Sequence, residues 1–504
     1  MPFDSYVFVL FFLPLLVLVW RAVAIVHKPA LGPVLLGASI LFCFWASPAA
    51  LLILGLMILV NYGLGLALAA PGEREGSLRR KGLLFLALVL NFTPLLLVRY
   101  LPRLGLLFPS MSGVEREIPF WSTLWEGMAA SGPENVFVLG TTELAGISFW
   151  TLVQAAWLIS IYKRHLEPEG LMRHGLFSLA FPYLLAGPIV RYEQMGTQFD
   201  NLDAPSLPTL ATGLGLFLAG LAKKVLLANW LGAHADTIFA AAAEGYALTS
   251  PEALWGVFAF SFQVYFDFSG YIDMALGAAL MLGLRLPENF AAPYRATGFI
   301  EFWRRWHITL SSFVREYVYQ PLAGPAPSFP RAFLGVMAGL LAIGLWHGAA
   351  LNFLAWILLH ALFLGLNVAL RKAKGPGLDA FFSGLFVRGI CILVTFVLVS
   401  LAWVLFRADS LPHALALYRA LFDVTGSLSL FANGYFSGAI SLVPLIIAAI
   451  CTFALPTARE VFLGCRDGSR PWLNFAPTLS WALVLACAAF ACLSVMDMTR
   501  PFIF

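Results

Sequence analysis

Charged residues are scarce in this sequence of 504 residues. Asp, Glu, Lys and Arg together make up 12% of it, whereas about 25% is usual for a soluble domain. Hydrophobic residues make up 60%, and the mean hydropathy is +0.85. So little charge excludes a soluble globular protein and predicts an all-α polytopic integral membrane protein.

Other features are missing as well. We find no internal repeat, which weakens the case for a carrier built from duplicated halves. The six cysteines show no CxxC or other metal spacing, so we expect neither a metal site nor a disulfide. The net charge is only +4, and the basic residues are dispersed at helix ends. We therefore expect the lipid bilayer as the surroundings and no nucleic-acid partner.

A full membrane span needs ~20 apolar residues, and the apolar runs of this sequence vary in length around that value. We expect roughly 11–13 membrane segments, some of them re-entrant. The runs lie near residues 6–20, 33–46, 48–70, 82–98, 143–162, 176–190, 208–231, 253–281, 333–346, 350–370, 385–405, 437–455 and 477–495.

Basic loops predict the orientation of the chain, because Lys and Arg are enriched on the cytoplasmic side. They place both termini and the loop at 101–142, with its four glutamates, outside. No basic residues precede the first apolar run, so we expect a retained span rather than a signal peptide. The basic segments are 21–28, 71–82, 162–174, 371–374 and 459–470.

Ionisable residues concentrate in the middle of the chain, between residues 261 and 320. We expect one transmembrane domain over residues 1–504, with its working part in the centre. Within it we expect N-terminal scaffold spans and an extracytoplasmic loop at 1–140, a catalytic core at 141–370, and C-terminal spans at 371–504.

One predicted helix of this region carries a polar stripe. Gln263, Asp267 and Tyr271 recur every four residues, so they share a face that should contact protein or water. Asp273 points elsewhere, and we expect it to pair with a different helix. An interhelical hydrogen bond is the structural alternative for either aspartate. Pro287 is predicted to end this helix.

The segment EFWRRWHITLSSFVREYVYQPL, at 301–322, packs charge among aromatic residues. Ionisable groups at membrane depth are costly and usually functional. We predict a helix from near Ile300, in which Glu301 pairs with Arg305 four residues later. The apolar residues fall on one face, which favours an interfacial or partly re-entrant amphipathic helix.

Two of the eight histidines are candidates for catalysis, His307 in this segment and His347 in LLAIGLWHGAALNF. Small residues around His347, Gly344 and Gly348, let a ligand or another backbone approach. Desolvation lowers the pKa of a histidine, so His347 should be neutral and able to accept a proton. A helix–helix hydrogen bond is the structural alternative for both histidines.

The other six histidines have ordinary explanations as solvated or packed side chains. They are His27, His165 and His174 in basic loops, His234 and His413 near helix ends, and His360 in an apolar helix.

The double arginine and the aromatic residues near the two histidines suit a site that binds an anionic carrier and activates a hydroxyl. Arginine clamps phosphate, and a histidine beside a thioester can deprotonate an alcohol. We expect these residues to bind the donor or to line its tunnel: Trp303, Arg304, Arg305, Trp306, Arg315, Tyr317, Asp267, Tyr271, Asn289 and Trp346.

Long blocks of this region resemble the membrane-bound O-acyltransferase (MBOAT) superfamily, in particular the branch of the alginate O-acetyltransferase membrane subunit (AlgI). The blocks are FQVYFDFSGYIDMALGAALMLGLRLPENFAAPY, EFWRRWHITLSSFVREYVYQPL and GLWHGA. Five shorter pieces agree in order: GISFWTLVQ, FPYLLAGPIVRY, GLAKKVLLANWL, WVLFRADSLPHAL and TRPFIF. AGISFW and QPLAGPAP depart from the usual LGISFY and PLGGN-like pattern, which leaves donor and partner contacts open.

The resemblance implies that His347 is the catalytic residue and that His307 is its companion. It implies the MBOAT fold, a ring of helices around a thin centre that a tunnel crosses. It implies acetyl-CoA or another acyl thioester as the cytoplasmic donor substrate, with no permanently bound cofactor.

The same resemblance implies O-acetylation of an exopolysaccharide by a protein of the bacterial inner membrane. An extracytoplasmic SGNH-type acetyltransferase or esterase-like protein and the polysaccharide synthesis machinery are the expected partners. The alternatives are a transporter or flippase and a structural subunit of an exopolysaccharide export complex. The polymer and the acyl chain length are not readable from the sequence.

Overall fold

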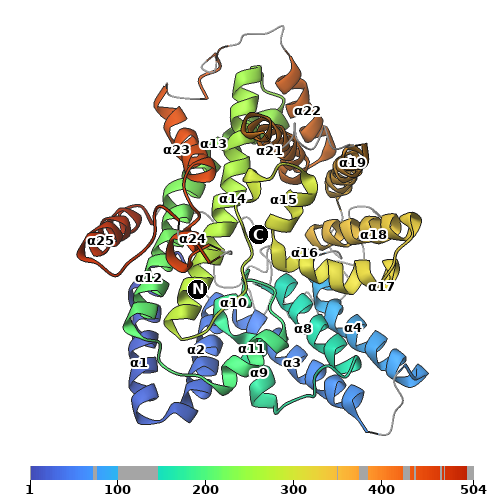
Figure 1. Ribbon diagram of the computed structural model, residues 1–504, viewed down its shortest axis with the longest axis vertical. Helices are drawn as coiled ribbons and strands as arrows, with labels where there is room; N and C mark the ends of the chain where they lie inside the picture. The colour runs from blue at the N-terminus through green and yellow to red at the C-terminus, as the bar shows by residue number, and fades with distance from the viewer. Residues whose placement is uncertain are drawn as a thin grey trace, which may run out of the picture. The chain divides into compact units, whose positions relative to one another are not determined.

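The computed structural model describes residues 2–71, 76–99, 146–348, 350–373, 384–423, 429, 432–435, 439–465, 468–469 and 471–496. All regular elements in these residues are helices, which confirms the predicted all-α class. The chain divides into two compact units (Figure 1), the first with residues 18–203 and the second with residues 2–17 and 204–504.

Several predicted segments lie outside these residues. The expected extracytoplasmic loop at 101–142 and the C-terminal residues 497–504 are wholly outside, and the basic segments at 71–82, 371–374 and 459–470 are partly outside. Their side of the membrane stays a prediction.

Within the described ranges, eight helices are long and apolar enough to cross a membrane. Three shorter apolar helices, at 147–162, 443–453 and 479–493, add to them. This confirms the predicted polytopic membrane protein. The eight helices cover residues 7–26, 28–46, 48–69, 78–97, 207–244, 329–347, 351–370 and 385–407.

The first unit is held together by buried polar contacts between its helices. Asn61 donates to the Asn91 side chain and Asn91 donates to the Thr151 carbonyl, both at 2.9 Å, which ties three helices together. Its helices are α1 (Leu13–Val26), which begins in the second unit, η2 (Lys28–Ala30), α2 (Leu31–Ala46), α3 (Pro48–Ala69), α4 (Leu78–Arg99), α8 (Ile147–Tyr162), α9 (Leu171–Leu179), α10 (Phe181–Leu184) and α11 (Tyr192–Asp200).

The apolar run predicted at 176–190 is not one helix. Helix α9 ends at Leu179, α10 covers only Phe181–Leu184, and the chain to residue 191 has no helix. Pro182 explains the new start, because a residue without an N–H is best tolerated in the first turn of a helix.

The second unit is built around helix α14 (Ser250–Met281), which runs through its middle in Figure 1. Nearly all side chains of α14 are buried, because it packs against α12, η4, α13, α21 and α22. The other helices of this unit are η1 (Val7–Phe12), α12 (Leu207–Ala222), η4 (Lys223–Ala228), α13 (Asn229–Glu244), η5 (Pro293–Arg295), α15 (Phe299–Arg305), α16 (Ile308–Val314), η6 (Arg315–Tyr319), α17 (Gln320–Ala323), α18 (Phe329–His347), α19 (Leu351–Ala373), α21 (Leu385–Arg407), α22 (Leu411–Phe422), η7 (Ala439–Leu442), α23 (Val443–Phe453), α24 (Ala458–Leu463) and α25 (Leu479–Leu493).

Helix α14 ends earlier than predicted. Its last residue is Met281, and Gly283 then adopts a positive φ of 78°. A left-handed glycine after the last turn is a common helix stop. The prediction that Pro287 ends the helix is therefore wrong, because Gly283 has already turned the chain.

Glycines bring α12 and α14 into backbone contact. A methyl group on Gly220 would lie 2.5 Å from the Gly270 oxygen, and one on Gly277 would lie 2.5 Å from the Gly213 oxygen. The glycines of each helix are seven residues apart, so both contacts lie on one face. Only residues without a side chain permit this approach.

Two consecutive lysines of η4 form ion pairs with α14. Lys223 Nζ lies 2.5 Å from Asp273 Oδ2, and Lys224 Nζ lies 2.6 Å from Asp267 Oδ1. The predicted pairing of Asp273 with a different helix is confirmed. Unpaired charges are very costly to bury, so the two pairs explain how α14 carries two aspartates inside the unit.

Candidate active site

The helix predicted from near Ile300 is broken. Helix α15 (Phe299–Arg305) and helix α16 (Ile308–Val314) are separated by Trp306 and His307. His307 has a φ of 44°, in the left-handed region that residues other than glycine seldom adopt. The prediction of one continuous amphipathic helix is therefore wrong, and the break sets His307 at the start of α16.

The chain around Asn289 satisfies the backbone groups that the break exposes. The N–H of Ala291 donates to the Arg305 carbonyl at 3.0 Å, and the N–H of Ile308 donates to the Asn289 carbonyl at 2.9 Å. Asn289 Oδ1 accepts from the Thr309 N–H at 3.1 Å and from its hydroxyl at 2.8 Å. Asn289 thus caps α16 from a different part of the chain.

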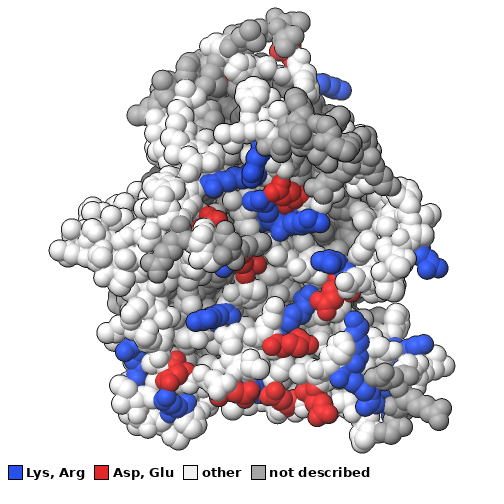
Figure 2. Space-filling view, viewed as in Figure 1, with Lys and Arg blue, Asp and Glu red and all other residues white. Residues whose placement is uncertain are grey.

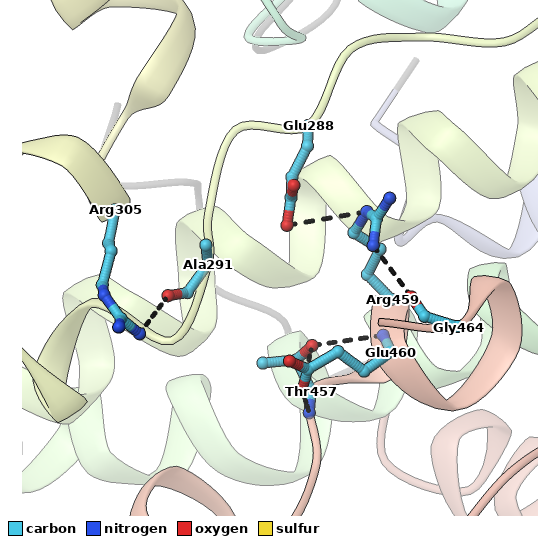
Figure 3. Close-up of polar contacts among 7 residues, drawn as sticks. All are labelled: Glu288, Ala291, Arg305, Thr457, Arg459, Glu460 and Gly464. Atoms are coloured by element: carbon cyan, nitrogen blue, oxygen red, sulfur yellow. Dashed lines mark hydrogen bonds and ion pairs between the residues drawn. The ribbon is translucent and has the colours of Figure 1, made fainter. Parts of the chain in front are cut away.

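Arg305 also helps to fix this loop. Its Nη2 lies 2.5 Å from Glu301 Oε1, which confirms the predicted pair, and its Nη1 donates to the Ala291 carbonyl at 3.3 Å (Figure 3). Burial acts to raise the pKa of Glu301, but hydrogen bonds from Thr297 and the charge of Arg305 hold that pKa below its usual value. Arg305 therefore serves to position the chain, whereas neighbouring Arg304 is exposed.

His307 and His347, 40 residues apart in the sequence, line one small cavity. The ring of Trp346 contacts both, with its centroid 6.2 Å from that of His307 and 4.8 Å from that of His347. The remaining lining residues are apolar or aromatic: Trp303, Trp306, Leu310, Ile343, Trp356, Trp403 and Phe406. Among these lining residues the two histidines carry the imidazole nitrogens, which can accept a hydrogen bond or a proton.

His307 is buried, with 2% of its surface exposed. Its Nδ1 lies 3.1 Å from Asn289 Oδ1, and the ring of Phe268 meets it edge to face at 4.9 Å. Desolvation by burial lowers the pKa of His307 to about 3. The ring is therefore neutral at physiological pH.

His347 is the last residue of α18, and aromatic rings surround it. The ring of Phe406 lies 5.0 Å away and that of Trp356 lies 5.7 Å away, both edge to face. Gly344, one turn earlier, packs on Ile357 so closely that a methyl group there would lie 1.4 Å from Ile357 Cδ1. As predicted, a small residue before His347 allows another helix to approach.

A second small cavity is lined in part by charged and polar side chains. Its lining includes the Lys223–Asp273 pair, Asn289, and Glu288 with Arg459, whose facing atoms are 3.5 Å apart (Figure 3). Polar walls of both signs suit ordered water or a polar group. Asn289 therefore touches both environments, since its Oδ1 faces His307 while the residue lines the polar cavity.

The predicted donor-binding residues are distributed over several places. Trp303 and Trp306 line the cavity of the two histidines, and Trp346 contacts both rings. Asp267 and Tyr271 do not line it: Asp267 pairs with Lys224, and Tyr271 stacks on Phe3 at 5.0 Å. Arg304 and Arg315 are exposed, and Tyr317 packs on Phe313 at 4.7 Å.

One of the six ordinary histidines differs from its prediction. His174 lies in α9 rather than in a basic loop, and it is buried against Trp157, with ring centroids 4.1 Å apart. His360 is packed as predicted, among aromatic rings such as Trp303 at 5.2 Å. The mistake arose because the basic residues around His174 suggested solvent.

The sequence reasoning missed three wall residues and two ion-pair partners. Trp356, Trp403 and Phe406 complete the wall of the cavity from α19 and α21, but in an apolar helix they look like ordinary core residues. Lys223 and Lys224 pair with the α14 aspartates. Two lysines in an apolar run were a signal of buried acidic partners. In the described residues no group of three or more His, Cys, Asp or Glu side chains could hold a metal ion.

Comparison with known proteins places the cavity inside a shared region. The family model described as "MBOAT, membrane-bound O-acyltransferase family" matches residues 113–373, which include both cavity histidines. A probable alginate O-acetylase of Pseudomonas aeruginosa is 31% identical over 424 residues, covering 84% of this chain and 75% of that protein.

Two further relatives have other substrates in their names. A peptidoglycan O-acetyltransferase of Helicobacter pylori is 36% identical over 307 residues, covering 56% of this chain and 57% of that protein. A teichoic acid D-alanyltransferase of Bacillus subtilis is 27% identical over 261 residues, covering 49% of this chain and 64% of that protein.

Proposed function

The chain belongs to the membrane-bound O-acyltransferase family and is a membrane acyltransferase; on this premise we propose that it moves an acetyl group from a cytoplasmic thioester toward an extracytoplasmic polysaccharide. The observation that carries the proposal is the pairing of His307 and His347 in one aromatic cavity. An unactivated hydroxyl needs a base to attack a thioester, and a neutral histidine is suited to that role near pH 7.

In the proposed reaction His347 is the general base. It accepts the proton of the acceptor hydroxyl while the hydroxyl oxygen attacks the thioester carbonyl carbon. The carbon–sulfur bond then breaks, an ester forms, and the leaving thiolate takes up the proton. Such proton transfer is worth typically ~10²–10⁴-fold in rate. In a variant of this route, His347 itself accepts the acyl group transiently. His307 orients a reacting group or stabilises charge beside it.

The aromatic wall supports the use of a thioester. Rings of Trp303, Trp306, Trp356 and Trp403 exclude water, which protects a reactive acyl group from hydrolysis.

We place the carrier of the donor, acetyl-CoA or another acyl thioester, at the charged face of the second unit. Figure 2 shows Lys, Arg, Asp and Glu side by side over the part that carries α14, α15 and α24. Exposed Arg304 lies in the last turn of α15, close to the break, so its guanidinium group is suited to a phosphate of the carrier. Arg305 pairs with Glu301 and donates to the Ala291 carbonyl. We therefore propose that it supports donor binding indirectly, by positioning the loop around Ala291.

The acceptor and the location follow from the relatives. Their names include an alginate O-acetylase and a peptidoglycan O-acetyltransferase, both of which modify polymers rich in hydroxyl groups. We propose that this chain lies in the bacterial inner membrane and serves exopolysaccharide O-acetylation. It would pass the acetyl group to a polymer hydroxyl or to an extracytoplasmic SGNH-type partner of the polysaccharide synthesis machinery.

The test is thioester turnover by the purified protein in proteoliposomes. Acetyl-CoA with a labelled acetyl group is supplied on the cytoplasmic side, and release of CoA and transfer of label are followed for the wild type and for His347→Ala. The proposal expects turnover that the variant loses. Equal turnover by the variant would remove His347 from the reaction.

A further inference from the structure

Three hydrogen bonds converge on the Oδ1 atom of Asn289, whose side chain is fully buried. The Thr309 N–H lies 3.1 Å away, the Thr309 hydroxyl 2.8 Å and His307 Nδ1 3.1 Å. These three bonds determine which nitrogen of His307 carries a proton, because they determine whether Asn289 or His307 is the donor in the bond between them.

The orientation of the Asn289 amide is fixed by the Thr309 backbone. A backbone N–H can only donate, so the amide atom that faces it must be the oxygen and cannot be the NH₂ group. The same oxygen faces His307 Nδ1. An oxygen without a hydrogen cannot donate to the ring, and Nδ1 must therefore carry the proton of this hydrogen bond.

A neutral imidazole has one protonated nitrogen, so a proton on Nδ1 leaves Nε2 with its lone pair. We propose that Asn289 is a positioning residue that holds His307 in the Nδ1–H tautomer, so that His307 acts in the cavity as a hydrogen-bond acceptor through Nε2. The inference rests on the proposed acyl transfer at His307 and His347.

The tautomer limits what His307 can do in the reaction. A lone pair on Nε2 accepts a hydrogen bond from a hydroxyl, and it can hold the acceptor alcohol in line for attack. It cannot donate to the negative oxygen that develops on the thioester carbonyl, which requires a donor. Of the two roles open to His307, orientation of a reacting group fits and stabilisation of negative charge does not.

Asn289 also caps α16, so a test must separate the cap from the tautomer. Thr309→Val provides the separation, because it removes the hydroxyl bond to Asn289 Oδ1 and leaves both the Thr309 backbone N–H and the His307 bond. Asn289→Ala removes all three bonds to the side chain. A purely structural cap would make both variants lose stability without a change in the protonated nitrogen of His307.

The deciding measurement is nitrogen NMR of the full chain in liposomes with ¹⁵N-labelled histidine. The chain has 8 histidines, and loss of signals in His307→Asn assigns those of His307. In the wild type at pH 7 we expect a protonated Nδ1 and an unprotonated Nε2 for His307. A proton on Nε2, or on both nitrogens, would overturn the inference, and this result needs no folded Asn289 variant.

Turnover of acetyl-CoA provides the second measurement. Asn289→Ala frees the His307 ring from its hydrogen bond, so we expect kcat to fall by between about 10-fold and about 10⁴-fold, with a small change in the KM of the donor. The upper value is the loss known for an enzyme whose histidine is in the wrong tautomer. Thr309→Val should keep kcat within about 3-fold of the wild type. Equal losses in the two variants would assign Asn289 to the cap alone.

The two proposals fail in different ways. If His307→Asn and His347→Ala keep full turnover, the proposed site is wrong, whatever nitrogen carries the proton. If both lose turnover while His307 has its proton on Nε2, the site stands and the role of Asn289 is wrong.

Discussion

Lys224 Nζ lies 2.6 Å from Asp267 Oδ1, and the two side chains are 2% and 1% exposed. Both charges of this pair act on Asp4 in the N-terminal segment. There Asp4 is also buried, and desolvation raises its pKa to about 6 although the charge of Lys224 opposes the rise. The charge of Lys224 thus acts on two buried carboxyl groups distant in sequence, one in α14 and one in the N-terminal segment.

Removal of one partner of this pair should destabilise the fold more than removal of both. Lys224→Met removes the cation that faces the buried Asp267 carboxylate. Loss of one partner of a buried ion pair costs ~3–5 kcal/mol. The double variant Lys224→Met with Asp267→Leu should recover most of this loss, because both replacing side chains are apolar. The unfolding temperatures of the wild type, the single variant and the double variant, measured in detergent, give their order of stability. A double variant less stable than Lys224→Met would contradict the pair as a charge-compensating contact.

Loss of His347 should abolish activity and spare the fold. His347→Ala should lower acetyl-CoA turnover by ~10²–10⁴-fold, because no other base remains at the end of α18. His360→Phe is the matched control, since His360 is buried among similar rings but does not line the cavity. Both variants should unfold near the wild-type temperature. A similar loss in His360→Phe would show that aromatic packing, and not the imidazole of His347, limits the rate.

Arg304 should act on donor binding and not on chemistry. We expect Arg304→Ala to raise the KM for acetyl-CoA about 1.4–5-fold with kcat nearly unchanged, because an exposed ion pair is worth ~0.2–1 kcal/mol. Arg331, also exposed but at the start of α18, provides the control Arg331→Ala. Added salt should reduce the difference between wild type and Arg304→Ala. An unchanged KM would place the carrier elsewhere.

Much of the site could be predicted because its signals are local. Charge and histidine in apolar segments indicated His307, His347 and the α14 aspartates, and four-residue spacing indicated the pair of Glu301 with Arg305. The membrane class followed from composition alone. These signals depend only on residues near one another in sequence.

The break before α16 could not be predicted for the opposite reason. No glycine or proline marks Trp306 or His307, and the apolar pattern continues across them. What stabilises the break is a set of hydrogen bonds that Asn289 accepts and Ala291 donates, and both residues lie more than ten positions earlier. A local sequence pattern cannot predict such bonds between distant residues. For the same reason it could not predict that the lysines of η4 pair with the aspartates of α14.

Stability should fall in mild acid because of His174. Burial lowers the pKa of His174 to about 3, well below its usual value near 6.5. Between these values the unfolded chain binds a proton that the folded chain does not, so the free energy of unfolding decreases as pH falls from about 6.5 toward 3, at up to ~1.4 kcal/mol per pH unit. His174→Phe keeps an aromatic ring against Trp157 and removes this contribution. Its unfolding temperature should therefore drop less than that of the wild type between pH 7 and pH 5, and an equal drop would contradict the assignment.

The backbone of His307 should decide which substitutions the protein tolerates there. At a φ of 44°, asparagine is among the few other residues that fit, whereas a β-branched side chain meets strain. We expect His307→Asn to unfold near the wild-type temperature and His307→Val to lose a further ~1–2 kcal/mol. Both should lose acetyl transfer, since neither has an imidazole nitrogen in the cavity. Thermal unfolding and acetyl-CoA turnover, measured on the same preparations, separate the two effects. If His307→Asn were stable and fully active, His307 would serve only the turn between α15 and α16.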